Sequence, residues 1–530
     1  MNKRRYRIVF NKTRGMLMAV QETARSHGGG AGVSGTLDGT VPTAMALPAL
    51  RRVALLLGAP FGGMLIAGAA FAQIVADPNA PGNQRATVLE AANGVPQVDI
   101  QTPSAAGVSR NVFTQFDVGA NGVILNNSRT AVQTQLGGWV QGNPWLATGS
   151  ARVILNEVNS SNPSQLKGYV EVAGQRAETV IANPAGIVVD GGGFINVSRA
   201  TLTTGSPLMN GDGLTGFSVQ RGRIVIEGAG LDASRTDYIA LIARSVQLNA
   251  GVWAQKLNVI GGAGEVAEDG TTRQAAAPEN GAETAPVYAI DVARLGGMYA
   301  NHIYLVGTEA GVGVRNAGTI GAAAGDLIVT SGGRLENSGS LAASGRVQAK
   351  ADVVDNGGQM NAGTDLLLTA GSLRNAGAFN ATGDAAISVT SDADNREGSI
   401  EARRLDVEVG GALLNDHGRI AQNGMATLAI DAARVVNAGE LGRESLPVPA
   451  PGTPGGSDTG GESASPVAGN DAGTPVDGAP TIPEGGSVPM PPPDGRIKAR
   501  LVDNGSGLVT ANNGIWSERV SWTIAGVRRA

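Results

Sequence analysis

The chain has 530 residues, of which 79 are glycine and 4% are aromatic, and it contains no cysteine. So many glycines beside so few large rings favour a fold of many tight turns over an ordinary enzyme of this size. The hydrophobic content of 42% excludes disorder along the whole length. The formal net charge is −5 and no basic patch is interleaved with aromatic residues, which argues against a nucleic-acid-binding protein.

The first 72 residues are predicted to be an extended export signal. The chain begins with a basic segment, and a second basic pair, Arg51 and Arg52, precedes an apolar run over residues 53–70 and an Ala-x-Ala site. We expect export by the Sec machinery and cleavage between Ala72 and Gln73; the alternative is a transmembrane anchor. Removing the signal leaves 31 basic against 43 acidic residues, a net charge of −12.

Short apolar or alternating segments follow the signal, each bounded by Gly, Asn or Ser, as expected of short strands. Clear examples cover residues 122–128, 151–158, 222–231 and 238–248. No long helical periodicity appears, and residues 264–286 are expected to form an exposed loop. These features predict an all-β fold.

From residue 314 the chain repeats itself at intervals of 19 to 22 residues. Each unit carries an asparagine followed two or three residues later by a glycine; the asparagines are Asn316, Asn337, Asn356, Asn375, Asn395, Asn415 and Asn437. A period near 20 with short strands predicts a right-handed parallel β-helix, a solenoid with one repeat per coil. Equivalent asparagines should hydrogen-bond to one another at a corner, where the glycines supply positive φ. Leucine-rich repeats share the period, but their leucine spacing is absent.

Two Asn-Pro turns stand out before the repeats, "NPWL" at residues 143–146 and "NPAGI" at residues 183–187. Proline restricts the preceding residue to extended or turn geometry, so each motif predicts a rigid corner. The residues concerned are Asn143, Pro144, Trp145, Leu146, Asn183, Pro184, Ala185, Gly186 and Ile187.

With these turns the chain resembles the secretion domain of two-partner secretion exoproteins of the filamentous haemagglutinin and contact-dependent inhibition type. The resemblance also rests on "YRIVFNKTRGMLMAVQE", "GVSRNVFTQFDVGANGVILNNS" and "FINVSRATLTTG", and it covers about residues 1–441. Trp145 and Ala185 depart from the commonest forms of the two motifs. The resemblance implies that a cognate outer-membrane β-barrel transporter recognises the Asn-Pro segments in the periplasm. The alternative is that the two asparagines only shape corners.

The expected organisation is an export signal (1–72), a two-partner secretion domain (73–313), haemagglutinin-type repeats (314–443), a disordered Pro/Gly-rich linker (444–495) and a short basic segment (496–530). We expect a secreted or cell-surface adhesin that binds a host or bacterial receptor or glycan. The alternatives are a truncated contact-dependent growth-inhibition protein and a cytolysin of the same pathway. No cofactor, metal or catalytic residue is predicted, since the three histidines, His27, His302 and His417, are scattered.

Overall fold

The computed structural model describes residues 73–275, 285–426 and 428–443, together with strands at residues 6–11, 16–21, 495–503, 508–510 and 515–516. The chain divides into two compact units, Met1–Ala67 and Gly68–Ala530. In the first unit β1 (Tyr6–Asn11) pairs antiparallel with β2 (Met16–Gln21). The apolar run and Ala72 of the predicted export signal, His27 and nearly all of the predicted linker lie outside the described residues. In the described part, no helix is long and apolar enough to span a membrane.

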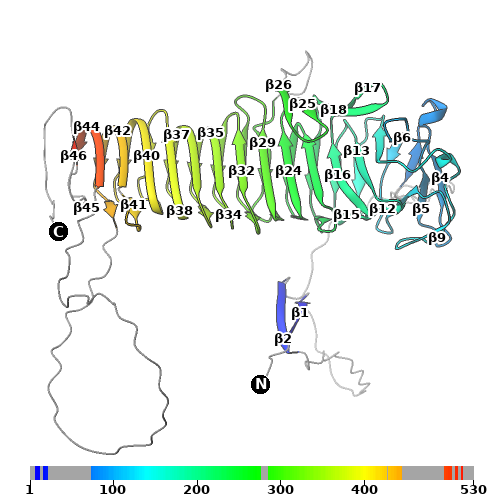
Figure 1. Cartoon of the computed structure of the whole chain (residues 1–530), viewed down its shortest axis with the longest axis horizontal. Coiled ribbons are helices and arrows are strands. Elements are labelled where there is room, and N and C mark those ends of the chain that lie inside the picture. The colour runs from blue at the N-terminus through cyan, green and yellow to red at the C-terminus, as the bar shows by residue number, and fades with distance from the viewer. Residues whose placement is uncertain are drawn as a thin grey trace, which may run out of the picture. The chain divides into compact units, whose positions relative to one another are not determined.

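The second unit is a β-solenoid (Figure 1). Each coil contributes one strand to each of three faces, here called A, B and C. Face A begins with β6 (Val108–Phe116), β10 (Val153–Val158), β13 (Ala177–Ala182), β16 (Val197–Thr203), β21 (Tyr238–Ala243), β24 (Lys256–Gly261), β29 (His302–Gly307) and β32 (Leu327–Ser331). Face B begins with β11 (Ser164–Leu166), β14 (Ile187–Val189), β19 (Arg223–Ile226), β22 (Ser245–Leu248), β27 (Tyr288–Val292), β30 (Gly313–Asn316) and β33 (Arg334–Asn337).

Face C carries the third strand of each coil. It comprises β5 (Pro96–Asp99), β7 (Val123–Asn127), β12 (Tyr169–Gly174), β15 (Gly192–Ile195), β20 (Leu231–Ala233), β23 (Gly251–Ala254), β28 (Gly297–Ala300), β31 (Thr319–Ala322), β34 (Ser340–Ala343) and β36 (Gln359–Ala362). Further along, single strands bend across a corner and serve two or three faces. These are β35 (Val347–Asn356), β37 (Leu366–Asn375), β38 (Ala378–Val389), β40 (Ser399–Asn415) and β42 (Leu428–Asn437), with the short β39 (Ala393–Asp394), β41 (Arg419–Gln422) and β43 (Glu440–Arg443) between them.

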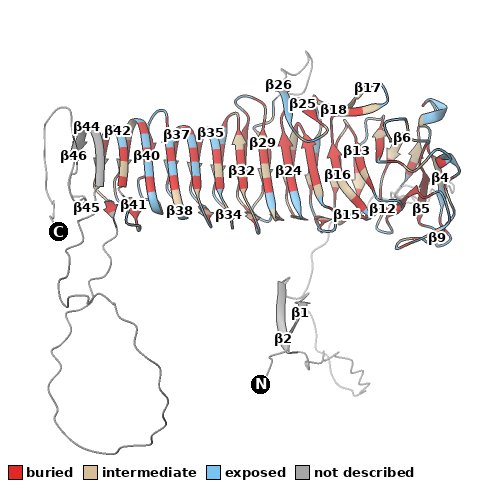
Figure 2. Cartoon of the chain, in the orientation of Figure 1, coloured by how far each residue is buried: buried red, intermediate tan, exposed pale blue. Residues whose placement is uncertain are grey.

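Strands of successive coils pair in parallel, so equivalent side chains stack in columns. On the inner side of face C, for example, Ile320, Leu341, Met360 and Phe379 occupy successive rows. One continuous hydrophobic cluster runs through the interior from Ile74 to Leu441. The parallel β-helix expected from the 20-residue period is therefore confirmed. Buried and exposed residues alternate along the repeat strands, as expected of a sheet with one solvent-exposed face (Figure 2).

Strands with unbroken apolar runs are covered on their outer side as well. A four-stranded antiparallel sheet of β17 (Ser206–Asn210), β18 (Gly213–Val219), β25 (Gly264–Ala267) and β26 (Thr272–Ala275) contributes Phe217 and Val266 to a second cluster against face A. The prediction of a loop over residues 264–286 is therefore wrong for its first part. Glu268, Asp269 and Gly270 form the three-residue loop of a β25–β26 hairpin, in which the Gly270 N–H donates to the Ala267 carbonyl at 2.9 Å and Gly270 has a φ of 87°.

The N-terminal end of the solenoid is closed by strands that run against the coils. β3 (Ile74–Ala76) lies antiparallel on β6, and β4 (Thr87–Glu90) lies antiparallel on β5, with the 3₁₀ turn η1 (Gly82–Gln84) between them. The hairpin of β8 (Val132–Thr134) and β9 (Gly138–Val140) adds Val140 to a third cluster over β7.

At the other end, the solenoid continues past residue 443, where the sequence suggested that it stops. β44 (Gly495–Asp503) pairs in parallel with β42, and β45 (Leu508–Thr510) pairs in parallel with β43. β46 (Ile515–Trp516) then pairs with β44. The Pro-rich segment thus lies between two consecutive strands of the solenoid, β43 and β44, and part of the basic C-terminal segment belongs to the same fold.

Candidate functional site

The second Asn-Pro motif forms the corner between β13 on face A and β14 on face B. The Asn183 side chain is fully buried; its Nδ2 donates to the Asn162 carbonyl and to Ser164 Oγ, both at 3.0 Å. Its Oδ1 accepts from the backbone N–H of Ala185 at 2.9 Å, and the Gly186 N–H donates to the Asn183 carbonyl at 3.0 Å. Gly186 has a φ of 123°, a conformation that favours glycine. All parts of the amide are therefore used inside the corner.

The first Asn-Pro motif lies in the connection from β9 to β10. Asn143 caps the 3₁₀ turn η2 (Pro144–Leu146) by accepting from the Trp145 N–H at 2.9 Å. Its Nδ2 donates to the carbonyls of Ile100 and Asn126, both at 2.9 Å. Leu146 is buried beneath the turn, whereas the Trp145 ring is 44% exposed. The structure thus brings each motif together as a rigid corner but places the two motifs on different corners.

The burial of both asparagines limits which form of the chain can present their amides to a partner. A partner that met the folded solenoid would reach Pro144 and Trp145 but neither asparagine amide, since Asn143 is 3% and Asn183 is 0% exposed. The two amides are accessible only in a chain whose coils have not yet closed. A partner that contacted these two amides would therefore have to bind the chain before the coils close.

The seven repeat asparagines form one column, the asparagine ladder, at the end of the face B strands. Each Nδ2 donates to the Oδ1 of the next asparagine at 2.7–2.8 Å, from Asn316 as far as Asn437. All seven side chains are at most 1% exposed. In the preceding coil the same place is taken by Val292, and Leu248 stands there one coil earlier. The ladder therefore begins where an apolar column ends.

The glycines that follow the ladder asparagines have another role than the predicted one. None of Gly318, Gly339, Gly358 and Gly377 has a positive φ. A Cβ on each would instead collide with a backbone carbonyl oxygen of the previous coil, so glycine is needed for close stacking. In the two units with three-residue spacing, the extra residues Glu397 and His417 take up the left-handed conformation, with φ of 63° and 55°.

A buried ion pair that the sequence analysis did not identify joins three coils at the corner between faces A and B. Arg244 Nη2 lies 3.2 Å from Glu309 Oε1, with side-chain exposures of 2% and 10%. Glu309 Oε2 also accepts from the Ala263 N–H at 3.2 Å. These residues follow β21, β24 and β29, so the pair connects successive turns of the solenoid. The two residues are 65 positions apart, and no local motif links them.

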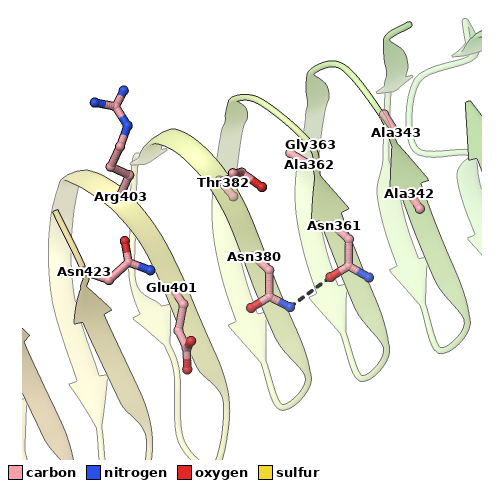
Figure 3. Close-up of a pocket in the computed structure, with 11 residues that line it drawn as sticks. Ala342, Ala343, Asn361, Ala362, Gly363, Asn380, Thr382, Glu401, Arg403 and Asn423 are labelled. Atoms are coloured by element: carbon pink, nitrogen blue, oxygen red, sulfur yellow. Dashed lines mark hydrogen bonds between the residues drawn. The ribbon is translucent and has the colours of Figure 1, made fainter. Parts of the chain in front are cut away.

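A shallow groove of about 680 Å³ crosses the outer side of face C in the repeats (Figure 3). Its lining includes Ala342 and Ala362, and Asn380 Nδ2 donates to Asn361 Oδ1 at 2.8 Å. Glu401 accepts from Arg419 Nε at 2.9 Å. Within residues 73–273, 285–426 and 428–442, no three histidine or carboxylate side chains gather as metal ligands. His302 and His417 are both exposed and lie in different coils.

A parallel β-solenoid behind an extended export signal is the architecture expected of a two-partner secretion exoprotein. The family model "TPS secretion domain" matches residues 72–337, and "Extended Signal Peptide of Type V secretion system" matches residues 1–50. The chain belongs to the family of proteins that carry a TPS secretion domain. The matched range includes the first two ladder asparagines, which the sequence analysis had assigned to the repeats.

Named relatives are similar over about two thirds of the chain. It is 53% identical over 345 residues to "Toxin CdiA" of Yersinia pestis and 50% identical over 347 residues to "tRNA nuclease CdiA-2" of Burkholderia pseudomallei (strain 1026b). Each alignment covers 64% of this chain but only 10% and 11% of the relatives, so the chain spans about a tenth of their length. The crystal structure of the filamentous hemagglutinin secretion domain matches with 30% identity and a TM-score of 0.47, over 62% of this chain and 96% of that one.

Family membership establishes the export route of the protein. The extended signal and the secretion domain direct it through the periplasm to secretion at the cell surface. A domain of this family implies a cognate outer-membrane transporter as partner. The domain itself serves secretion and structure rather than catalysis.

Proposed function

We propose that this chain is an adhesin-type surface interaction protein whose cognate transporter reads the two Asn-Pro motifs before the coils close. The burial of the Asn143 and Asn183 amides carries this proposal, because it leaves the unfolded chain as the only form that presents them. After transport, the solenoid closes over both amides, and its outer faces become the surface that meets other cells.

Strand addition offers a physical route for recognition. An extended segment can add to the edge of a receptor sheet through main-chain hydrogen bonds, with side chains giving specificity. Residues 177–182 and 187–189, on either side of the second motif, are strand-forming segments. The periplasm has no ATP, and each coil that forms outside provides a template for the next, which biases transport outward.

A second function is favoured by the relatives. The first of them is named a toxin and the next a nuclease, and both are about ten times longer than the region they share with this chain. This chain would then belong to a contact-dependent growth-inhibition system.

Secretion tests the transporter step. The full chain is expressed with and without a two-partner transporter, and the medium is assayed by quantitative immunoblot. We expect secretion only with the transporter and a clear reduction for Asn183→Ala. Equal amounts of chain in the medium with and without the transporter would refute the proposal.

A matched control separates recognition from folding. Asn156 is also fully buried, pairs in register with Ile181 of the neighbouring coil, and donates to the Val180 carbonyl at 3.1 Å, but no proline follows it. Asn156→Ala should therefore carry a folding cost without loss of a recognition motif. If both variants lose secretion equally, the asparagines only shape corners. Binding of the urea-unfolded chain to the transporter's periplasmic domains, where folding makes no contribution, provides the second measurement.

The surface role is separated from growth inhibition by two assays on the same cells. Adherence of cells displaying the chain to target cells should exceed that of transporter-only cells. Growth of the target cells in co-culture should stay unchanged. Inhibited growth without greater adherence would favour the second function.

A further inference from the structure

The outward side chains of face C form one column along the solenoid, here called the C-face track. Register places Asp232, Trp253, Tyr299, Gly321, Ala342, Asn361, Asn380 and Glu401 in successive coils of this column. The track therefore passes from a carboxylate through two aromatic rings and two small residues to amides and a second carboxylate. Its far half is the groove of Figure 3.

The two rings lie next to each other with nearly parallel planes, and both are partly exposed. Trp253 and Tyr299 are each 43% exposed, their centroids are 6.3 Å apart, and their planes differ by 17°. A glycine two residues before each ring leaves room for it to lie over the strand. A Cβ on Gly251 would stand 2.6 Å from Trp253 Cη2, and a Cβ on Gly297 would stand 2.8 Å from Tyr299 Oη. Glycine at these two positions therefore leaves the space that the two rings occupy.

Polar groups border the rings. Gln255 Nε2 donates to the Ser234 carbonyl at 2.9 Å, and Asn301 Nδ2 donates to Gln255 Oε1 at 2.7 Å. Asp232 accepts from the Tyr169 hydroxyl at 2.8 Å. Burial opposes ionisation of Asp232, but hydrogen bonds from Ser234 and Tyr169 outweigh it and lower the pKa of this carboxyl. Exposed rings with amides and a carboxylate at their edge suit a ligand that has apolar C–H faces and a rim of hydroxyl groups.

The floor beyond the rings is open. Nothing lies within 4 Å of a Cβ built on Gly321, and Ala342 follows in the next coil. Successive rows are about 4.8 Å apart, which is close to the length of one pyranose unit in an extended chain. A linear ligand with one sugar per coil therefore keeps in step with the track.

Charge selects among such ligands. In the groove, Glu401 is paired with Arg419, and Arg403 is paired with Asp384 at 2.6 Å. The chain after the signal has a net charge of −12, which opposes polyanions. The track is therefore better suited to an uncharged polymer than to an acidic one.

We propose that the C-face track binds a neutral, extended polysaccharide, with Trp253 and Tyr299 stacking on pyranose rings and Asn361 and Asn380 contacting hydroxyl groups. This proposal rests on the proposed surface-interaction role and gives it a ligand class and a site. A protein docking on the same rings is the competing occupant, and the test below distinguishes it.

Affinity electrophoresis of the purified full chain provides the test. Native gels contain hydroxyethylcellulose, galactomannan or soluble starch as neutral probes and alginate as an acidic probe. We expect at least one neutral probe to retard the chain, and Trp253→Ala to weaken that binding about tenfold. Trp139→Ala is the matched control, because this tryptophan is 68% exposed in β9, away from the track.

Two further variants protect the test against misfolding. Trp253→Phe keeps a ring over Gly251 and should retain most of the binding. Gly321→Gln places a side chain in the open row and should weaken binding while both rings stay intact. No retardation by any neutral probe, retardation by alginate alone, or retardation that Trp253→Ala and Gly321→Gln leave unchanged would each overturn the proposal. Adherence that persists without polysaccharide binding would point to a protein occupant and leave the proposed surface role standing.

Discussion

Replacing Asn356 by alanine removes a middle member of the asparagine ladder. This amide accepts from Asn337 Nδ2 and donates to Asn375 Oδ1, both at 2.7 Å, in a fully buried position. After the change Asn375 Oδ1 loses its ladder donor, whereas Asn337 Nδ2 keeps a bond to the Gln359 carbonyl at 3.2 Å. Each buried polar group left unsatisfied costs about 1–3 kcal/mol, so we expect a loss of about 2–3 kcal/mol in the free energy of unfolding.

The first member of the ladder provides the comparison. Asn316 follows Val292 in register, so Asn316→Ala deprives one ladder amide, that of Asn337, of its donor. It also removes the acceptor of the Gly318 N–H at 3.2 Å, so we expect a loss of about 1–3 kcal/mol. Asn361→Ala, on the half-buried outer side of face C, controls for loss of an amide outside the ladder and should cost about 0.5 kcal/mol or less. Urea unfolding followed by far-ultraviolet circular dichroism measures all three. Equal and negligible losses at Asn316 and Asn356 would refute the ladder argument.

Two further predictions concern stacking and charge. Gly358→Ala should destabilise the solenoid by about 1–3 kcal/mol, because the new Cβ meets a carbonyl of the previous coil. Gly321→Ala, in open space, should be nearly neutral in the same urea titration, and similar losses at both glycines would contradict the steric explanation. Glu309→Gln should cost about 3–5 kcal/mol because it leaves the Arg244 charge buried without its carboxylate. A change in melting temperature no larger than that of an exposed ion-pair variant would contradict this.

Periodic features could be predicted from the sequence because they depend on local chemistry. The 20-residue spacing predicts coils, and an asparagine at each interval predicts a column, since parallel in-register pairing places equal positions above one another. The Asn-Pro corners follow from the restricted backbone of proline and its predecessor.

The role of the repeat glycines could not be decided in the same way. A positive φ and a close backbone approach both require glycine, so the residue type alone does not distinguish them. Only the distance between stacked coils shows that Gly339 and Gly377 are needed for space.

Contacts between segments that are distant in the sequence also could not be predicted. Arg244 and Glu309 are linked only by the turns of the solenoid between them. The pairing of β44 with β42 could not be predicted because the long Pro-rich segment separates the two strands in the sequence. The aromatic pair had a usable signal in "GVW" at 251–253 and "GMY" at 297–299, where a glycine precedes each ring by two positions.

The closed N-terminal end of the solenoid gives folding a direction. Coil strands add to one another in parallel, but β3 and β4 run antiparallel to the strands they cover and so leave no matching edge for a further coil. Growth is therefore possible only toward the C-terminus, where β42 offers a parallel edge that β44 takes up. In a chain that emerges progressively, the coils holding Asn143 and Asn183 close first and bury both amides. The repeats then form on this base, and each new ladder asparagine finds its hydrogen-bond partner already in place.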